Sequence, residues 1–104
     1  MTKKAYLVVR AVMEDEAARP AFDQWYETDH VVFAKRAFAC EKAWRFWSRS
    51  DASVHYAVYR FADMPTLEAS LATPEAAETI VDFDRVWPKV KRSREILEGA
   101  QILG

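Results

Sequence analysis

The chain has 104 residues, 51% of them hydrophobic, with 15 Lys and Arg against 16 Asp and Glu. This length predicts one domain spanning residues 1–104, and the formal net charge of −1 argues against nucleic acid or an anionic membrane as a partner. No apolar run approaches the ~20 residues of a membrane span. The lone Cys40 makes a cytoplasmic location the expectation.

The first predicted elements are a strand and a helix. Residues 5–13 are apolar and rich in β-branched side chains, which is typical of a strand. Acidic residues at 14–16 and then Pro20 introduce a helix whose apolar residues recur at helical spacing. We expect this helix to end between Asp29 and Arg36.

The later elements complete a familiar order. Residues 42–49 and 54–62 predict two strands joined by a polar turn. A short helix follows from Met64 to about Ala72, and a second begins after Thr73 as N-cap and stops at Pro88. A final strand lies within 92–103. The order β-α-β-β-α-β predicts an α+β, ferredoxin-like antiparallel sheet with helices on one face.

Alternation of side chains along the strands predicts two different faces of this sheet. The face expected under the helices collects Leu7, Val9, Ala11, Met13, Trp44, Phe46, His55, Ala57, Tyr59 and Phe61. The opposite face collects Tyr6, Val8, Arg10, Val12, Ala43, Arg45, Trp47, Tyr56, Val58 and Arg60. A solvated face would be mostly polar, so this second face predicts a homodimer through stacked sheets. Its interface residues would include Tyr6, Arg10, Arg45, Trp47, Tyr56 and Arg60.

The segment Phe22-Asp23-Gln24-Trp25-Tyr26-Glu27-Thr28-Asp29-His30 resembles the Phe-x-x-Trp-Tyr-x-x-acid-His signature of EthD-like proteins, within the dimeric α+β barrel superfamily. Segments 43–46, 56–61 and 64–70 are similar to later parts of that family. The resemblance implies two ferredoxin-like sheets stacked into a barrel, with a cavity in each subunit.

The chain departs from this family pattern after the histidine. Members usually carry a proline two residues later and a Pro-Gly pair before the next phenylalanine, whereas this chain has Val32 and Arg36-Ala37. The superfamily includes small monooxygenases, muconolactone isomerase and polyketide cyclases. The resemblance therefore implies a ligand cavity more than it implies one reaction.

Three residues of the segment are candidates for catalysis. His30 can take and return protons near neutral pH, although a histidine that is only hydrogen-bonded at a helix edge is the alternative. Asp29 falls on the apolar stripe of the helix, and three interpretations of it are open. It is a buried acid with a raised pKa, a partner that orients a histidine or arginine, or a residue at the helix end that turns away. Tyr26 could donate its hydroxyl to a substrate oxygen, or simply pack in the core.

Other residues are candidates for lining the cavity. Each of them also has an ordinary reading as a core side chain. The candidates are Phe22, Trp25, Trp44, His55 and Tyr59.

Neither a metal nor a cofactor is expected. His30, His55, Cys40 and Asp29 follow no metal-site spacing, and phosphate-loop, dinucleotide and nucleophile-elbow motifs are absent from the sequence. The sequence leaves several functions open for a ligand that is apolar and aromatic, polyketide-like or a lactone. The first is a cofactor-independent enzyme with His30 as general acid and base. The others are a cofactor-independent monooxygenase and a non-catalytic carrier or accessory subunit.

Overall fold

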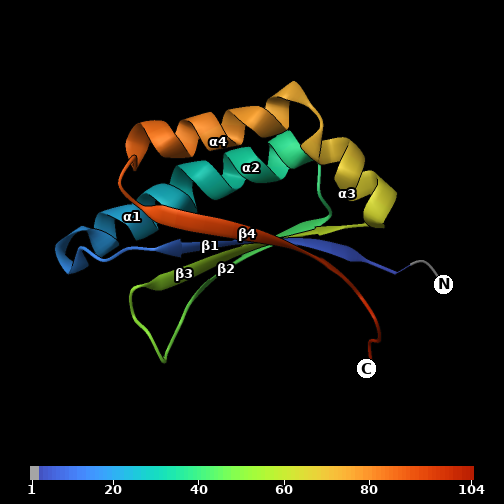
Figure 1. Cartoon of the computed structure of the whole chain (residues 1–104), viewed down its shortest axis with the longest axis horizontal. Coiled ribbons are helices and arrows are strands. Elements are labelled where there is room, and N and C mark those ends of the chain that lie inside the picture. The colour runs from blue at the N-terminus through green and yellow to red at the C-terminus, as the bar shows by residue number, and fades with distance from the viewer. Residues whose placement is uncertain (1–2) are drawn as a thin grey trace.

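The computed structural model describes residues 3–104, so the first two residues of the predicted domain lie outside the described part. Within this range four strands form one antiparallel sheet, and the helices cover one side of it (Figure 1). The strands are β1 (Ala5–Val12), β2 (Lys42–Trp47), β3 (Val54–Phe61) and β4 (Lys91–Glu98), in the spatial order β2-β3-β1-β4. The predicted ferredoxin-like α+β arrangement is confirmed.

Six helical elements lie within residues 3–104, and three of them begin at a residue whose side chain caps the helix. They are η1 (Glu16–Ala18), α1 (Arg19–Trp25), η2 (Tyr26–His30), α2 (Val31–Phe38), α3 (Met64–Leu71) and α4 (Pro74–Val86). The Asp63 carboxylate accepts a hydrogen bond from the Thr66 N–H at the start of α3. The Thr73 hydroxyl accepts one from the Ala76 N–H at the start of α4, as an N-cap does.

The first long helix runs without a break from Arg19 to Phe38, so the predicted end between Asp29 and Arg36 is wrong. Its buried residues recur every four positions, at Phe22, Tyr26, His30, Ala34 and Phe38. In an α-helix this spacing would rotate the stripe by about 40° at each step. The turn η2 is π-helical, and the Val31 N–H donates to the Tyr26 carbonyl five residues back. This wider turn absorbs one residue and keeps the stripe facing the sheet.

The phase of β2 is the opposite of the predicted one. In the register of the sheet Arg45 lies across from Ala57, and Trp47 lies across from His55. Residues paired across strands share a face, and Ala57 and His55 belong to the face beneath the helices. Arg45 and Trp47 therefore point toward the helices, and their neighbours Trp44 and Phe46 point away. A shift of one residue reverses every side chain of a strand.

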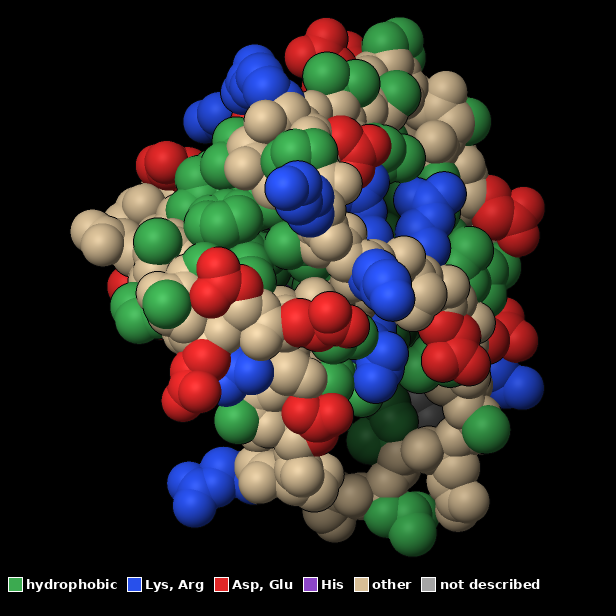
Figure 2. Space-filling view, turned by 60° about the vertical axis from the view of Figure 1, so that its left-hand side comes forward, with side chains coloured by type: hydrophobic (Ala, Val, Ile, Leu, Met, Phe, Trp, Pro, Cys, Tyr) green, Lys and Arg blue, Asp and Glu red, His purple; other side chains and the backbone are tan. Residues whose placement is uncertain are grey.

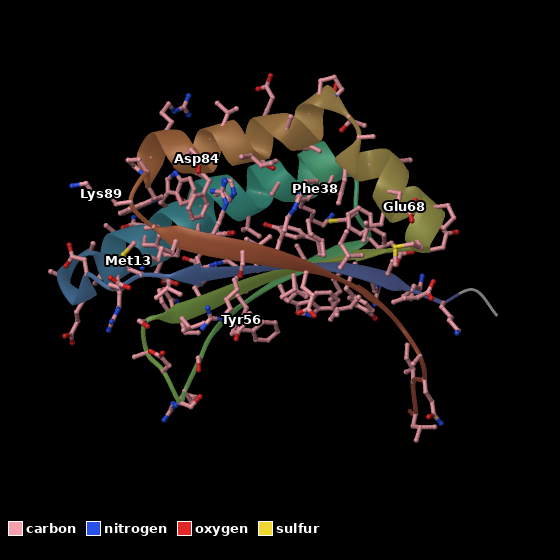
Figure 3. All side chains as sticks on the ribbon, in the orientation of Figure 1. Met13, Phe38, Tyr56, Glu68, Asp84 and Lys89 are labelled. Carbon is pink, nitrogen blue, oxygen red and sulfur yellow. The ribbon has the colours of Figure 1, made fainter. Side chains whose placement is uncertain are left out.

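The core lies between the sheet and the helices, whereas the other face of the sheet is open. The largest fully buried side chains are Tyr26, Tyr59, Phe22, Phe61, Phe83, Leu7, Leu67 and His55. Figure 3 shows Phe38 between α2 and the sheet, and Tyr56 on the side of the sheet away from the helices. Tyr6, Arg10, Tyr56 and Arg60 lie on this open face, where the parity of β1 and β3 predicts them.

Candidate functional site

His30 occupies the last position of the π-helical turn and is held from two sides. Its side chain is buried, and its Nδ1 lies 2.8 Å from Oδ2 of Asp82 on α4. The Trp25 ring stacks on the imidazole with the ring centroids 4.6 Å apart and the planes 18° from parallel. Together these contacts fix both the position and the plane of the imidazole ring.

The contact with Asp82 determines which nitrogen of His30 is available for chemistry. A carboxylate only accepts hydrogen bonds, so the Nδ1 of His30 carries the proton and donates it to Asp82. The other oxygen of Asp82 accepts from Nη2 of Arg85 at 2.8 Å. Burial lowers the pKa of His30, and hydrogen bonding to Asp82 partly opposes this. His30 is therefore a neutral imidazole at pH 7 whose Nε2 is free to take a proton.

A cavity of about 280 Å³ lies between the sheet and the helices α2 and α4. This volume is close to the lower end of the range for small-molecule sites, about 300–1,000 Å³. Its wall combines apolar side chains with polar and charged ones in similar measure. The lining residues are Leu7, Val9, Tyr26, His30, Ala34, Phe38, Tyr59, Thr79, Ile80, Phe83, Arg92, Ser93 and Arg94.

Tyr26 and Tyr59 supply two phenol groups to this cavity. Burial raises the pKa of Tyr26 to about 12, and burial also raises the pKa of Tyr59 well above its ordinary value. Each hydroxyl interacts with the other, which also affects both pKa values. Both side chains therefore remain neutral phenols at physiological pH. Because the bond between the two hydroxyls uses one O–H hydrogen, the pair has one left to donate to a ligand oxygen.

Asp29 is not part of the cavity. Its side chain is exposed, because the wider turn η2 places His30 instead of Asp29 on the buried stripe. The structure thus favours the reading in which Asp29 turns away. The carboxylate that orients His30 comes from α4 instead, and it is Asp82.

His55 is fully buried but does not line the cavity. Its Nε2 accepts a hydrogen bond from Nε of Arg45 at 3.2 Å, and its ring contacts the rings of Phe22, Tyr26 and Trp47. Burial and, to a smaller extent, the nearby Arg45 charge lower the pKa of His55 to about 3. His55 is therefore a neutral core histidine, and its prediction as a cavity residue is wrong.

The remaining predicted cavity walls also lie elsewhere. Trp44 is on the open face of the sheet, with Nζ of Lys42 5.1 Å from its ring centroid. Phe22 is buried against Trp47 and Trp87 and does not line the cavity. Trp25 stacks on His30 but is not among the lining residues. Of this predicted set, Tyr59 alone lines the cavity.

Arg45 and Trp47, which were predicted at the dimer interface, form a polar cluster beneath α1. The Asp23 carboxylate accepts from Nη2 of Arg45 and from Nε1 of Trp47, the latter at 2.8 Å. The bond from Trp47 lowers the pKa of Asp23, the hydrogen bond and charge of Arg45 lower it further, and burial opposes both. The face of β2 that carries these residues is thus committed to packing within the subunit.

Sequence reasoning did not identify Asp82, Arg92 or Thr79 as site residues. Asp82 and Thr79 lie on α4. Arg92 lies on β4 and pairs with Ala11 of β1, so its side chain is on the helix side of the sheet. Each residue looks unremarkable within its own element. The available signal was the alternation along 91–98, which places Arg92 and Arg94 on one face.

Charges elsewhere on the described surface are mixed. Figure 2 shows basic side chains running down the middle of one face with acidic side chains close on both sides. Residues 3–104 contain no group of three or more His, Cys, Asp or Glu side chains that could hold a metal ion. In the same range, none of the helices has the length and hydropathy required to cross a membrane.

Neither a protein-family model nor a curated protein matches the sequence. Several solved structures are similar in fold. A dimeric ferredoxin-like protein from an uncultured marine organism has a TM-score of 0.73 at 15% identity, covering 97% of this chain and 99% of that chain. An EthD-family protein from Bacillus halodurans has a TM-score of 0.71 at 13% identity, covering 95% of this chain and 99% of that chain.

A third similar structure belongs to SnoaB, a cofactor-independent oxygenase from Streptomyces nogalater. It has a TM-score of 0.70 at 15% identity, covering 96% of this chain and 96% of that chain. At these identities the likeness is one of fold. It confirms the ferredoxin-like fold that the resemblance to EthD-like proteins implied, with an EthD-family protein among the similar structures.

Proposed function

We propose that this protein binds a small apolar molecule in the 280 Å³ cavity and transfers a proton on it, with His30 as general base and no cofactor. The observation that carries the proposal is the Asp82–His30 pair beside the cavity. It leaves a neutral imidazole nitrogen available where a ligand would lie. The substrate class is an aromatic, polyketide-like or lactone compound with an acidic C–H next to a carbonyl group.

The cavity residues account for each proton that moves in the proposed step. Nε2 of His30 takes the proton from the carbon, and the C–H electron pair forms the new double bond of an enolate. The negative charge then lies on the former carbonyl oxygen, to which the Tyr26–Tyr59 pair can donate one phenol hydrogen. The imidazolium returns the proton to another position of the substrate, which makes the overall reaction an isomerisation or part of a cyclisation.

Exchange of the α-hydrogens of 2-tetralone in deuterium oxide, followed by proton NMR, tests this step without knowledge of the natural substrate. We expect the protein to accelerate the exchange and His30→Gln to lower that acceleration by about 10²-fold or more. His55→Gln is the matched control, since His55 lies outside the cavity. Equal acceleration by wild type and His30→Gln would remove His30 from the mechanism. Binding of the ketone without acceleration would favour a carrier.

The similarity to SnoaB favours a second candidate, a cofactor-independent oxygenase. An enolate held in the cavity is also the electron-rich species that such an oxygenation needs. The two candidates differ in oxygen uptake. Consumption of dissolved oxygen with an enolisable substrate, lost in His30→Gln, would favour the oxygenase.

We further propose that the protein is a homodimer through the open face of the sheet. The corrected phase of β2 makes this face more apolar, since Val8, Val58 and Trp44 form a continuous row across β1, β3 and β2. Phe46 on this face is 52% exposed and Leu97 is 43% exposed in the single chain. Tyr6, Arg10, Tyr56 and Arg60 complete the proposed interface, whereas Arg45 and Trp47 do not belong to it. The lone Cys40 supports the cytoplasm as its location.

A further inference from the structure

Two arginines line the cavity from β4, and they differ in their exposure to solvent. Arg94 is exposed, whereas only 20% of the Arg92 side chain is accessible. Water screens an exposed charge strongly and a buried one weakly. Arg92 is therefore the arginine whose charge is felt inside the cavity, and it lowers the pKa values of both His30 and Tyr26.

The guanidinium of Arg92 is fixed in place by two contacts. Its Nη2 pairs with Oδ1 of Asp84 at 3.0 Å, and its Cζ lies 4.2 Å from the ring centroid of Phe83. The other terminal nitrogen of the guanidinium, Nη1, is buried and has no hydrogen-bond partner within residues 3–104. Buried donors are almost always bonded, and one left alone costs about 1–3 kcal/mol, more when it is charged. Nη1 is thus a rigidly held cationic donor that lacks an acceptor.

The acceptor that best matches such a donor is a negatively charged oxygen, because charge-assisted hydrogen bonds are the strongest of this kind. Asp84 offsets the charge of Arg92 only in part, since 63% of its own side chain is exposed to water. Among the other lining residues that could bond an anion, Tyr26 and Tyr59 are neutral and Arg94 is exposed to water, so Arg92 is the strongest partner for an anionic group there.

We propose that Arg92 binds an oxyanion of the ligand through Nη1, so that the cavity selects flat apolar molecules carrying a carboxylate or an enolate oxygen. This inference rests on the proposed function only in taking the same cavity as the ligand site. It does not require turnover. For an enolisable ligand, the carbonyl oxygen would face Arg92 while the acidic carbon faces His30, so the charge formed by proton removal would be stabilised where it develops.

Binding of two matched pairs of probes at pH 8.5, measured by calorimetry, tests the inference and identifies the source of the oxyanion. The first pair is 2-naphthoate and 2-naphthamide, which share a ring system and differ in charge. The second pair is 4-nitrophenolate and 4-nitroanisole, which mimic an enolate and its neutral ether. We expect the anion of at least one pair to bind about 10- to 100-fold more tightly than its neutral partner.

The variants separate anion binding from a purely structural role of Arg92. Arg92→Met keeps an apolar stem and should abolish the preference for the anion, and Arg92→Lys, which retains a charge, should keep part of it. Asp84→Asn removes the ion pair but leaves Nη1, and should retain the full preference. Arg49→Met, in the turn between β2 and β3 and outside the cavity lining, should behave as wild type. Thermal unfolding followed by circular dichroism confirms that each variant is folded.

Three outcomes would overturn the inference. Equal affinity for anion and neutral partner in both pairs, or a preference that survives in folded Arg92→Met, would overturn it while leaving the proposed function intact. Failure of all four probes to bind would overturn both. Conversely, an Arg92-dependent preference without His30-dependent exchange of 2-tetralone would support the anion site and contradict the proposed catalysis.

Discussion

The Nδ1 of His30 lies 2.8 Å from Oδ2 of Asp82, although 52 residues separate the two along the chain. The pair joins the π-helical turn η2 to the neighbouring helix α4. The carboxylate holds the imidazole in the tautomer that presents Nε2, and thereby converts a buried histidine into a candidate base.

Asp82→Asn should lower the pKa of His30 further, because the carboxylate is the group that raises it against the effect of burial. The amide also permits the wrong tautomer, and we expect exchange of 2-tetralone to slow by about 10- to 100-fold. NMR titration of the imidazole resonances measures the pKa. Glu78→Gln removes an exposed carboxylate from the same helix and is the control. An unchanged His30 titration in Asp82→Asn would contradict this arrangement.

Phe46→Asp should dissociate the proposed dimer, because it places a charge on the open face of β2 without disturbing the core. We expect the sedimentation of wild type to give a mass of twice 12.0 kDa. The dissociation constant of the dimer should be about 10-fold or more higher in the variant. Val81→Asp changes a side chain that is 64% exposed on α4 and should leave the dimer intact. Analytical ultracentrifugation over a concentration series measures both. A wild type that stays monomeric throughout the series would rule out the interface.

Arg45→Met should destabilise the fold and leave the association of subunits unchanged. The substitution removes the donor that contacts both Asp23 and His55 beneath α1. We expect a loss of about 1–3 kcal/mol in the free energy of unfolding, since Asp23 is partly solvated and recovers some hydration. Urea unfolding measures this, with Arg49→Met within about 0.5 kcal/mol of wild type as control. Dissociation of a folded Arg45→Met protein into monomers would instead show that Arg45 belongs to the dimer interface.

Stability should fall as the pH falls from about 6.5 toward about 3, in part because of His55. The folded protein keeps His55 neutral, whereas the unfolded chain returns it to its ordinary pKa of 6.5. Below that pH the unfolded state binds a proton that the folded state does not, so acid favours unfolding. One such proton contributes up to about 1.4 kcal/mol per pH unit.

Urea unfolding of wild type and His55→Gln between pH 5 and 7.5 measures this contribution. The variant should show a shallower dependence on pH, whatever its absolute stability. His30→Gln should also flatten the dependence, since burial lowers the pKa of His30 as well. Identical slopes for wild type and His55→Gln would show that His55 is not held neutral in the folded protein.

The sequence by itself determined the order of the elements, the faces of β1 and β3, and the capping of α4 by Thr73. These depend on contacts between near neighbours, such as the alternation within a strand and the bond from the Ala76 N–H to Thr73. It also singled out Tyr26, His30 and Tyr59, all of which line the cavity. Tyr26 and Tyr59 lie at positions that local periodicity already assigns to the buried side, whereas His30 was identified by its chemistry and by the resemblance to EthD-like proteins.

The tertiary structure alone decided the phase of β2, the π-helical turn, and the approach of Asp82 and Arg92 to the cavity. The phase of β2 follows from its pairing with β3, and a shift of a single residue would move Arg45 and Trp47 to the other face. The wider turn is selected because it buries His30 in place of Asp29. Asp82 reaches His30 only when α4 packs beside η2, and Arg92 reaches the cavity only when β4 pairs with β1. No local hydrogen-bond or hydrophobic pattern encodes contacts between segments so far apart.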